Sequence, residues 1–246
     1  MTEPAAGDPT ETLQLADWRR RVADLYAEVR RLAGTDREAA LELWRATREQ
    51  LFREHPQSPV PATKREEFRA HHYPVDPAMR FEVVVEADAP SAPRQAGKPI
   101  AATPLTFGPE DAASPSSGLS LATPIAMDLP VSAGGTMAMR KIGGVEIPFP
   151  AGARRLGVFW MSGYAGGLFV PFRDATNRSE TYGAGRYLLD TAKSADLGGD
   201  PTRGTLILDF NFAFHPSCAF DPKWACPLAP PDNRLDIPIQ AGERLA

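Results

Sequence analysis

From residue 80 onward the chain is a succession of short apolar runs, and this pattern constrains the fold more than any other feature. Each run either alternates apolar with polar residues or is continuously apolar, and each is bounded by Gly, Pro, Ser or Asp. Such runs are typical of antiparallel strands joined by short connections. The runs are FEVVVEA, AATPLTFG, LSLATPIAMDL, TMAMRKIGGVEIPF, RRLGVFWM, GLFVPFRD and TLILDFNFAF. The expected closure is an antiparallel β sandwich or half-open barrel.

Two segments with helical periodicity precede these runs. From Leu15 to Leu32 apolar residues recur every three or four positions, which places one apolar stripe along a helix. Gly34 ends this segment, and Thr35 or Asp36 can cap a second helix. A connection this short favours an antiparallel helical hairpin. The predicted fold class is therefore α+β, mainly β, with the hairpin packed on the β domain of its own chain.

Proline and glycine divide the chain further. We expect a flexible tail at 1–12, the helical hairpin at 13–55, a proline-rich connector at 56–79 and a β-rich domain with a C-terminal proline-rich covering loop at 80–246. The stretch from Asp88 to Lys98 is predicted to be an exposed loop, and WMSGYAGGLFV a glycine-rich hairpin loop. Gly143 and Gly144 are predicted to form a two-residue hairpin turn, because glycine adopts positive φ without strain.

Charge and hydropathy exclude several classes of partner. A net charge of -4 and a pI near 5.6 give no reason to expect nucleic acid or an anionic membrane. No apolar run approaches the ~20 residues of a spanning helix. The N-terminal residues are acidic and lack the apolar core of a signal peptide, so a cytoplasmic protein is expected. The oligomeric state stays open.

The motifs that identify many enzymes are missing from the sequence. It contains no G-x-x-x-x-G-K-[ST], no G-x-G-x-x-G between strand and helix, no G-x-S-x-G and no H-E-x-x-H. No recognised catalytic motif therefore decides whether the chain is an enzyme, and no cofactor is expected.

One group of polar residues lies in FRDATNRSETYGAGRY, at the end of an apolar run. Arg173, Asp174, Thr176, Tyr182 and Arg186 are placed where polar side chains can converge at strand ends. They could bind a small anionic or hydroxylated ligand, with a guanidinium supplying paired donors. The same residues could equally form a tight turn beside an internal Arg-Asp ion pair.

A second polar group lies in TLILDFNFAF. If the run is one strand, Asp209 and Asn211 project from the same face of it, where they must be hydrogen-bonded or hydrated. A carboxylate at such a position can act as a general base or orient an arginine. Arg173 and Arg186 are the expected partners.

His215, Cys218 and Cys226 follow in a proline-rich stretch. Their spacing matches no zinc motif and there is no second C-x-x-C, so no metal site is expected. A catalytic Cys-His pair is disfavoured, because close neighbours on a proline-bent loop seldom face each other. The favoured interpretation is two buried thiols beneath a covering loop that prolines stiffen, although the seven residues between the cysteines would allow a disulfide.

The C-terminal third resembles a bacterial family of unknown function, domain-of-unknown-function family 1684. The resemblance is carried by LFVPFRDATNRSETYGAGRYLLD and TLILDFNFAFHPSCAFDPKWACPLAPPDNRLDIPIQAGER, and it extends more loosely over most of the chain. His215 departs from the pattern, which often has Asn there. The family supplies no activity, but its signature contains the polar residues selected above together with Asn233 and Glu243, which is compatible with an active site or with a hydrogen-bond network.

Two hypotheses result. In the first, the chain is a small-molecule-binding protein or enzyme with one polar site in the β domain. Its predicted catalytic residues are Asp209, Glu243 and Tyr182, and its predicted ligand-binding residues are Arg173, Asp174, Thr176, Arg186, Asn211 and Asn233. In the second, the chain is a non-catalytic structural or protein-interaction module in which these groups satisfy one another. An open pocket with an incompletely paired carboxylate would favour the first hypothesis.

Overall fold

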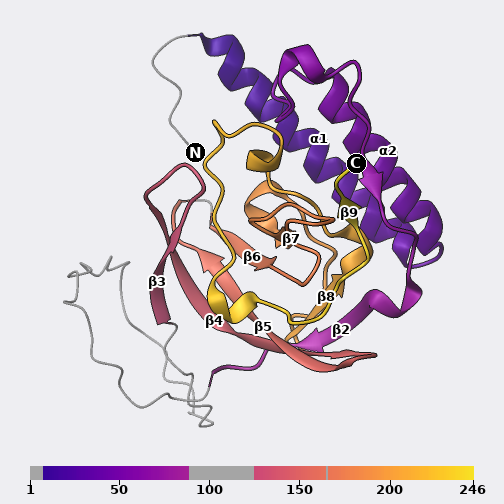
Figure 1. Cartoon of the computed structure of the whole chain (residues 1–246), viewed down its shortest axis with the longest axis vertical. Coiled ribbons are helices and arrows are strands. Elements are labelled where there is room, and N and C mark those ends of the chain that lie inside the picture. Colours follow the sequence, from indigo (N-terminus) through magenta and orange to yellow (C-terminus); the bar gives the residue numbers. More distant parts are fainter. Residues whose placement is uncertain (1–7, 89–124, 165) are drawn as a thin grey trace, which may run out of the picture.

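The computed structural model describes residues 8–88, 125–164 and 166–246 (Figure 1). The helices are α1 (Pro9–Ala33) and α2 (Arg37–Glu54). The strands are β1 (His71–His72), β2 (Arg80–Val84), β3 (Ile125–Pro130), β4 (Thr136–Phe149), β5 (Gly152–Met161), β6 (Gly167–Phe172), β7 (Arg186–Asp190), β8 (Thr205–Asp209) and β9 (Glu243–Arg244). The predicted strand AATPLTFG, the start of LSLATPIAMDL and nearly all of the predicted loop after Asp88 lie outside the described residues.

The helical hairpin forms as predicted, with an earlier start. The Asp8 carboxylate accepts a hydrogen bond from the Thr10 backbone N–H at 2.8 Å, and Pro9 occupies the first turn of α1. Residues 9–12 are therefore helical rather than part of a tail. Asp36 caps α2 in the same way, through the Ala39 N–H at 3.0 Å. The division of the chain into domains stays a prediction.

The strands form open antiparallel sheets. Five of them make one sheet in the order β3-β4-β5-β6-β7, while β2 pairs with β8 and β1 with β9. The predicted class, α+β and mainly β, is confirmed. The predicted loop between β5 and β6 is also present, because Met161 pairs with Gly167.

The predicted hairpin turn at Gly143 and Gly144 is wrong. Both glycines lie inside β4, and the chain reverses at residues 150–151. Gly144 exchanges two backbone hydrogen bonds with Glu86, at 2.8 and 2.9 Å. A Cβ on Gly143 would lie 2.3 Å from the Glu86 carbonyl oxygen. The glycines therefore allow a close approach of two backbones, beside a β-bulge after Lys141.

Two cores lie on opposite faces of the five-stranded sheet. On one face, Val145 and Ile147 of β4 pack with residues of β2, β8 and the C-terminal segment. On the other face, Met139 of β4 packs with the helical hairpin, including Trp44 of α2. All three β4 residues have odd numbers, so the bulge after Lys141 switches the face to which odd positions point. The expected packing of the hairpin on the β domain is confirmed (Figure 1).

The C-terminal segment departs from the predicted strand. β8 ends at Asp209, whose carboxylate accepts the Asn211 N–H at 3.0 Å and so caps a 3-10 turn at Phe210–Phe212. The alternation of apolar residues continues to Phe214, but the strand does not. The chain then crosses the sheet and ends beside the hairpin, where β9 pairs with β1 (Figure 1). Other 3-10 turns are Ala62–Lys64, Pro77–Met79, Thr191–Lys193, Ser217–Ala219 and Pro231–Asn233.

Trp44 tests how strongly the hairpin depends on the sheet. Its side chain is 1% exposed, its ring meets Phe212 edge-on, and its Nε1–H donates to the Tyr26 hydroxyl at 3.0 Å. Trp44→Ala is expected to lower the free energy of unfolding by about 3–5 kcal/mol, measured by urea denaturation. Leu13→Ala, at a side chain that is 68% exposed, is the control and should change little. A small loss in Trp44→Ala would contradict the shared core.

Candidate functional site

Arg186 and Asp174 form a fully buried ion pair. Arg186 Nη2 donates to Asp174 Oδ2 at 2.6 Å, and both side chains are 0% exposed. The guanidinium also donates to three carbonyl oxygens of the C-terminal segment, those of Ile239 (2.7 Å), Ala241 (2.5 Å) and Glu243 (3.0 Å). It therefore acts as a clamp between β7 and the end of the chain.

The other oxygen of Asp174 is also occupied. Oδ1 accepts the N–H of Thr176 at 2.8 Å and its hydroxyl at 2.5 Å, and the Thr176 hydroxyl lies 2.9 Å from that of Thr181. Each of these groups is buried. The predicted role in ligand binding does not suit Asp174, Thr176 and Arg186, because both carboxylate oxygens, the threonine hydroxyl and both Nη groups have internal partners and all three side chains are buried.

Glu243 is a second buried carboxylate with internal partners. It forms an ion pair with Arg48 of α2 through Nε, and its Oε2 accepts the His215 backbone N–H at 2.7 Å. Burial favours the neutral acid, but Arg48 and that N–H outweigh it and hold the pKa of Glu243 below its usual value. The left-handed Gly242, φ 78°, delivers the side chain into this position. As a charged, fully paired group, Glu243 is poorly suited to proton transfer.

His215 lies against this ion pair. Its Nε2 accepts the Tyr182 backbone N–H at 3.2 Å, and its Nδ1 is 3.7 Å from Glu243 Oε2. Burial lowers the pKa of His215 to about 4, so the imidazole is neutral near pH 7. The Tyr182 hydroxyl is within hydrogen-bond reach of the Cys218 sulfur, and burial and that sulfur raise the pKa of the phenol to about 12.

Asn233 and Arg173 join the C-terminal segment to the sheet. The Asn233 amide bonds the backbone N–H and carbonyl of Gly157 at 2.7 and 3.0 Å and the Pro171 carbonyl at 2.7 Å. Arg173 exchanges backbone hydrogen bonds with Asn233 and Leu235, and its Nε donates to Ala184 at 3.3 Å. Asn233 is 0% exposed, so its amide replaces strand pairing rather than facing a ligand.

Asp209 and Asn211 lie elsewhere, at a hollow between α2 and β2. Asp209 Oδ1 accepts the Asn211 N–H and its side-chain amide at 3.0 and 2.8 Å. Oδ2 has no hydrogen-bond partner in the described chain. The hollow has a volume of about 330 Å³, and one of about 140 Å³ adjoins it. Both are lined by Arg37, Arg80, Asp209 and Phe212.

The electrostatics of this hollow differ from those of the closed networks. Burial raises the pKa of Asp209, opposed by hydrogen bonds from Asn211 and by the charges of Arg80 and Arg37. Within the described chain, neither arginine side chain forms an ion pair or hydrogen bond, although both act electrostatically on Asp209. Two cations and a carboxylate oxygen are therefore available to a molecule that enters.

The predicted site residues thus do not converge on one pocket. Three arginines that matter for the arrangement were not predicted: Arg37, Arg48 and Arg80. Arg48 carried a signal, because it follows Trp44 by one helical turn on the apolar face of α2 and so requires a buried partner. Arg37 and Arg80 carried none, since they approach each other only through the tertiary fold.

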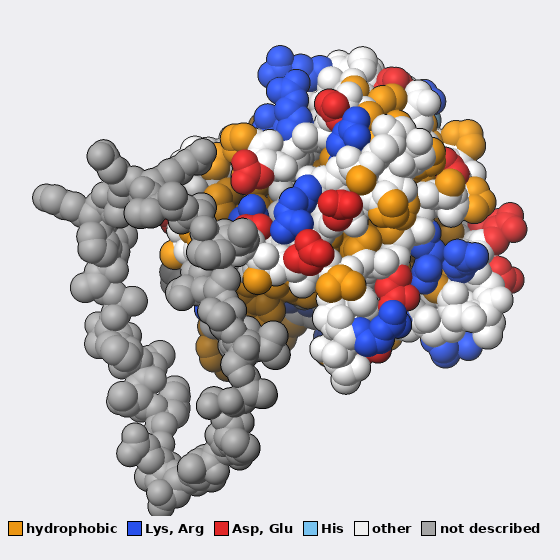
Figure 2. Space-filling model, turned by 90° about the horizontal axis from the view of Figure 1, so that it is seen from below, with side chains coloured by type: hydrophobic (Ala, Val, Ile, Leu, Met, Phe, Trp, Pro, Cys, Tyr) orange, Lys and Arg blue, Asp and Glu red, His pale blue; other side chains and the backbone are white. Residues whose placement is uncertain are grey.

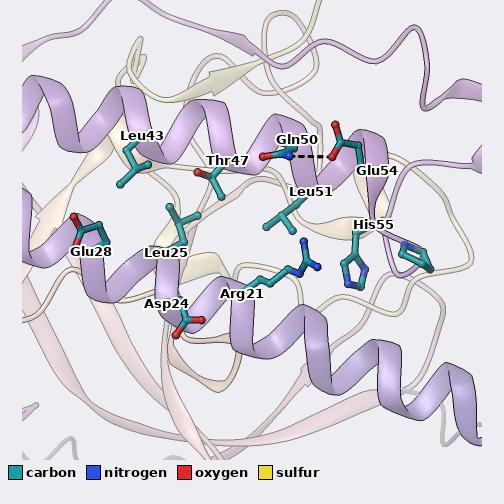
Figure 3. A pocket seen from close by; sticks show the side chains of 11 residues that line it. Arg21, Asp24, Leu25, Glu28, Leu43, Thr47, Gln50, Leu51, Glu54 and His55 are labelled. Carbon is teal, nitrogen blue, oxygen red and sulfur yellow. Dashed lines mark hydrogen bonds between the residues drawn. The ribbon is translucent and has the colours of Figure 1, made fainter.

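A larger groove lies on the outer side of the hairpin (Figure 3). It has a volume of about 370 Å³ and runs between α1 and α2. Its polar side chains are largely paired along the helices: Arg21 with Asp17 at 2.8 Å, and Gln50 with Glu54 at 3.0 Å. We therefore interpret it as the ordinary surface groove between two packed helices and not as a ligand site. Among the described residues, no group of three or more His, Cys, Asp or Glu is arranged to hold a metal ion.

The clamp predicts a specific pattern of stability. Arg186→Met leaves the Asp174 carboxylate buried without its cation and is expected to lower the free energy of unfolding by about 3–5 kcal/mol in urea. Adding Asp174→Asn removes that stranded charge and should restore part of the loss. A double variant no more stable than Arg186→Met would argue against the ion pair.

His215 predicts a pH dependence. The unfolded histidine has a pKa of about 6.5, whereas His215 titrates at about 4 in the folded protein. The unfolded state therefore binds more protons between these values, and stability falls as pH falls through this window. The loss from pH 7 to 4.5 should be on the order of 2 kcal/mol for this group. His72, with its pKa also lowered to about 4, adds to it.

His215→Asn removes one of the two titrating groups and should make the fall in stability shallower, measured by urea denaturation at each pH. His71→Asn, at an exposed histidine, is the matched control and should follow the parent protein. An unchanged pH profile in His215→Asn would show that His215 is not held neutral.

The comparisons with known proteins supply a family but no activity. A search of curated proteins finds no match. An uncharacterized protein of Haloarcula marismortui, solved by solution NMR, is similar in structure, with a TM-score of 0.53 and 29% sequence identity over 85% of this chain and 95% of that one. The family model described as protein of unknown function (DUF1684) matches residues 115–244. This range contains the C-terminal clamp and Asp209, and the chain belongs to that family.

Proposed function

We propose that the protein binds a small hydroxylated anion in the hollow beside Asp209. The observation that carries the proposal is the contrast in pairing: Asp209 is the one predicted carboxylate whose second oxygen lacks a partner in the described chain. Asp174 and Glu243 are each bound at both oxygens. A largely apolar hollow with a few convergent polar groups is the usual form of a small-molecule site.

The charges suit a ligand with two kinds of group. Arg37 and Arg80 can bind an anionic group through paired N–H donors, and neither has to leave an internal ion pair to do so. Asp209 Oδ2 can accept a hydrogen bond from a hydroxyl group of the same ligand. Leu41 and Phe212 supply apolar contact in the same hollow.

Asp209 is also the group placed to take a proton if the bound ligand reacts. Burial raises its pKa, which makes the carboxylate a stronger base than an exposed aspartate. Asn211 holds its other oxygen in place through two hydrogen bonds.

A second candidate function is a structural or protein-interaction module. It is favoured by the closed networks around Arg186, Glu243 and Asn233, which consume most of the predicted site. Under this hypothesis the Asp209 hollow has no ligand. The two candidates differ in a measurable way, because only a binding site gives stabilisation by a ligand.

Other sequence-based expectations stay predictions: a bacterial source, a cytoplasmic location and the lack of a nucleic-acid partner. Within the described residues, no helix is both long and apolar enough to cross a membrane. On the face shown in Figure 2, basic and acidic side chains are interspersed rather than gathered into a basic patch, which supports the prediction about nucleic acid.

The test uses three related probes: glycerol 3-phosphate, inorganic phosphate and glycerol. We expect glycerol 3-phosphate at millimolar concentration to raise the melting temperature by a few degrees, phosphate to raise it less and glycerol to leave it unchanged, because the site needs both an anion and a hydroxyl. Isothermal titration calorimetry would check the affinity.

Variants locate the effect. Arg80→Ala should remove the shift, while Asp209→Asn should remove the advantage of glycerol 3-phosphate over phosphate. Arg140→Ala, at an exposed arginine of β4, is the matched control and should retain both. Equal shifts in Arg80→Ala and Arg140→Ala, or no shift with any of the anions, would favour the structural module.

A further inference from the structure

The C-terminal loop brings Cys218 and Cys226 together. The Cys218 backbone N–H donates to Cys226 Sγ at 3.3 Å, and the two thiols are within hydrogen-bond reach of each other. Both are free and buried. Their proximity is a product of the fold, because the chain passes through the 3-10 turn Ser217–Ala219 and Pro222 before it returns at Cys226.

The returning segment is fixed to the sheet. Ser132, which follows β3, donates its N–H to the Cys226 carbonyl at 2.9 Å and accepts the Cys226 N–H on its hydroxyl at 3.0 Å. Leu228 donates to the Pro130 carbonyl at 2.9 Å. These bonds pair the segment from Cys226 to Leu228 with the end of β3 and fix the backbone of Cys226. Cys218 then lies against this fixed position.

The Cys218 sulfur has hydrogen-bond donors suited to a thiolate. The Cys226 thiol and the Tyr182 hydroxyl are both in reach of it. Ser132 is also close, but its hydroxyl proton is directed to the Trp224 carbonyl at 2.8 Å. The phenol remains protonated, because burial and the nearby sulfur raise the pKa of Tyr182 to about 12. Two donors therefore face one sulfur.

The two thiols titrate as a pair. The hydrogen bond from Cys226 lowers the pKa of Cys218 to about 6, against the opposing effect of burial. The same interaction raises the pKa of Cys226, because a second negative sulfur beside the first is unfavourable. Lys193, which is 3.0 Å from Asp190, lies near enough to act on both cysteines. The buried Tyr187, whose hydroxyl is bound to the Pro227 carbonyl, also faces the pair.

We propose that Cys218 and Cys226 form a redox-active dithiol that is oxidised to a disulfide by hydroperoxides, with Cys218 as nucleophile and Cys226 as resolving thiol. Cys218 is assigned the role of nucleophile because the Cys226 thiol and the Tyr182 hydroxyl both face its sulfur. This site is distinct from the Asp209 hollow and does not depend on the proposed function.

The reaction has two steps. The Cys218 thiolate attacks the terminal oxygen of the hydroperoxide; an S–O bond forms, the O–O bond breaks, and the leaving alkoxide takes a proton to become the alcohol. Cys226 then attacks the Cys218 sulfenic acid; the S–S bond forms, the S–O bond breaks, and the hydroxyl leaves as water with the Cys226 proton. Two thiols and one hydroperoxide thus give one disulfide, one alcohol and one water.

Mass spectrometry of the intact, reduced protein after one equivalent of hydrogen peroxide tests the proposal. The parent protein should lose two hydrogen atoms and become resistant to N-ethylmaleimide. Cys226→Ser should stop at the sulfenic acid, trapped by dimedone on Cys218, and Cys218→Ser should react at least tenfold more slowly. Thiols that react only after unfolding in urea, or equal rates in the two serine variants, would overturn the proposal.

A measurement on the parent protein avoids dependence on variants that fold poorly. The rate of first alkylation by iodoacetamide, mapped to Cys218 by peptide analysis, should rise with a midpoint well below 8.5, the value of an ordinary thiol, because the hydrogen bond from Cys226 lowers the pKa of Cys218. Tyr182→Phe should shift this midpoint upward, whereas Tyr164→Phe, at an exposed tyrosine, should not. A midpoint near 8.5 in the parent protein would contradict a stabilised thiolate.

Discussion

Arg186 carries a positive charge into a fully buried position, and the C-terminal segment is arranged around it. A buried guanidinium is strongly destabilising unless its donors are paired. Asp174 supplies the counter-charge, and it and the carbonyls of residues 239, 241 and 243 accept from the two Nη groups, whereas Nε has no partner in the described chain. The path of the last residues is thereby fixed, which places Glu243 against Arg48 of α2. One buried charge thus links β7, the C-terminus and, through the second ion pair, the helical hairpin.

This arrangement separates the polar residues of the family signature into two kinds. Most of them hold the C-terminal segment on the sheet and have no polar group left for a ligand, as in Asn233. Asp209 instead borders a hollow where two arginine side chains are without ion pairs in the described chain, while the amide of Asn211 beside it is bound to Asp76 and Asp209. Cys218 and Cys226 form a third centre, at the other end of the covering loop. Most residues of the signature therefore stabilise the fold by holding the C-terminal segment on the sheet. Ligand binding and redox chemistry are expected at Asp209 and at the two cysteines.

The periodicity of the sequence was sufficient to predict the hairpin, the antiparallel strands and the buried thiols, because each depends on local pattern and burial. The wrong predictions concern places where contacts outside the local sequence pattern determine the backbone path or the partner of a side chain. Gly143 and Gly144 have the composition of a turn, yet they serve the approach of Glu86, more than fifty residues away in the chain. The alternation up to Phe214 resembles a strand, but the Asp209 cap diverts the backbone at Phe210. Arg186 and Asp209 were expected to meet, whereas Arg186 finds its acceptors in the C-terminal segment. Arg37 and Arg80 come together only in the folded chain.

Side-chain NMR of the arginines tests this division between closed and open polar groups most directly. The Nε–H signals of Arg186, Arg48, Arg37 and Arg80 can be followed in one sample while inorganic phosphate is added. We predict that the Arg37 and Arg80 signals move with phosphate, while those of Arg186 and Arg48 keep their positions and exchange slowly with solvent. Movement of the Arg186 signal, or rapid exchange of its N–H protons, would contradict a buried clamp. It would indicate that the ligand binds at Arg186 and Asp174 instead.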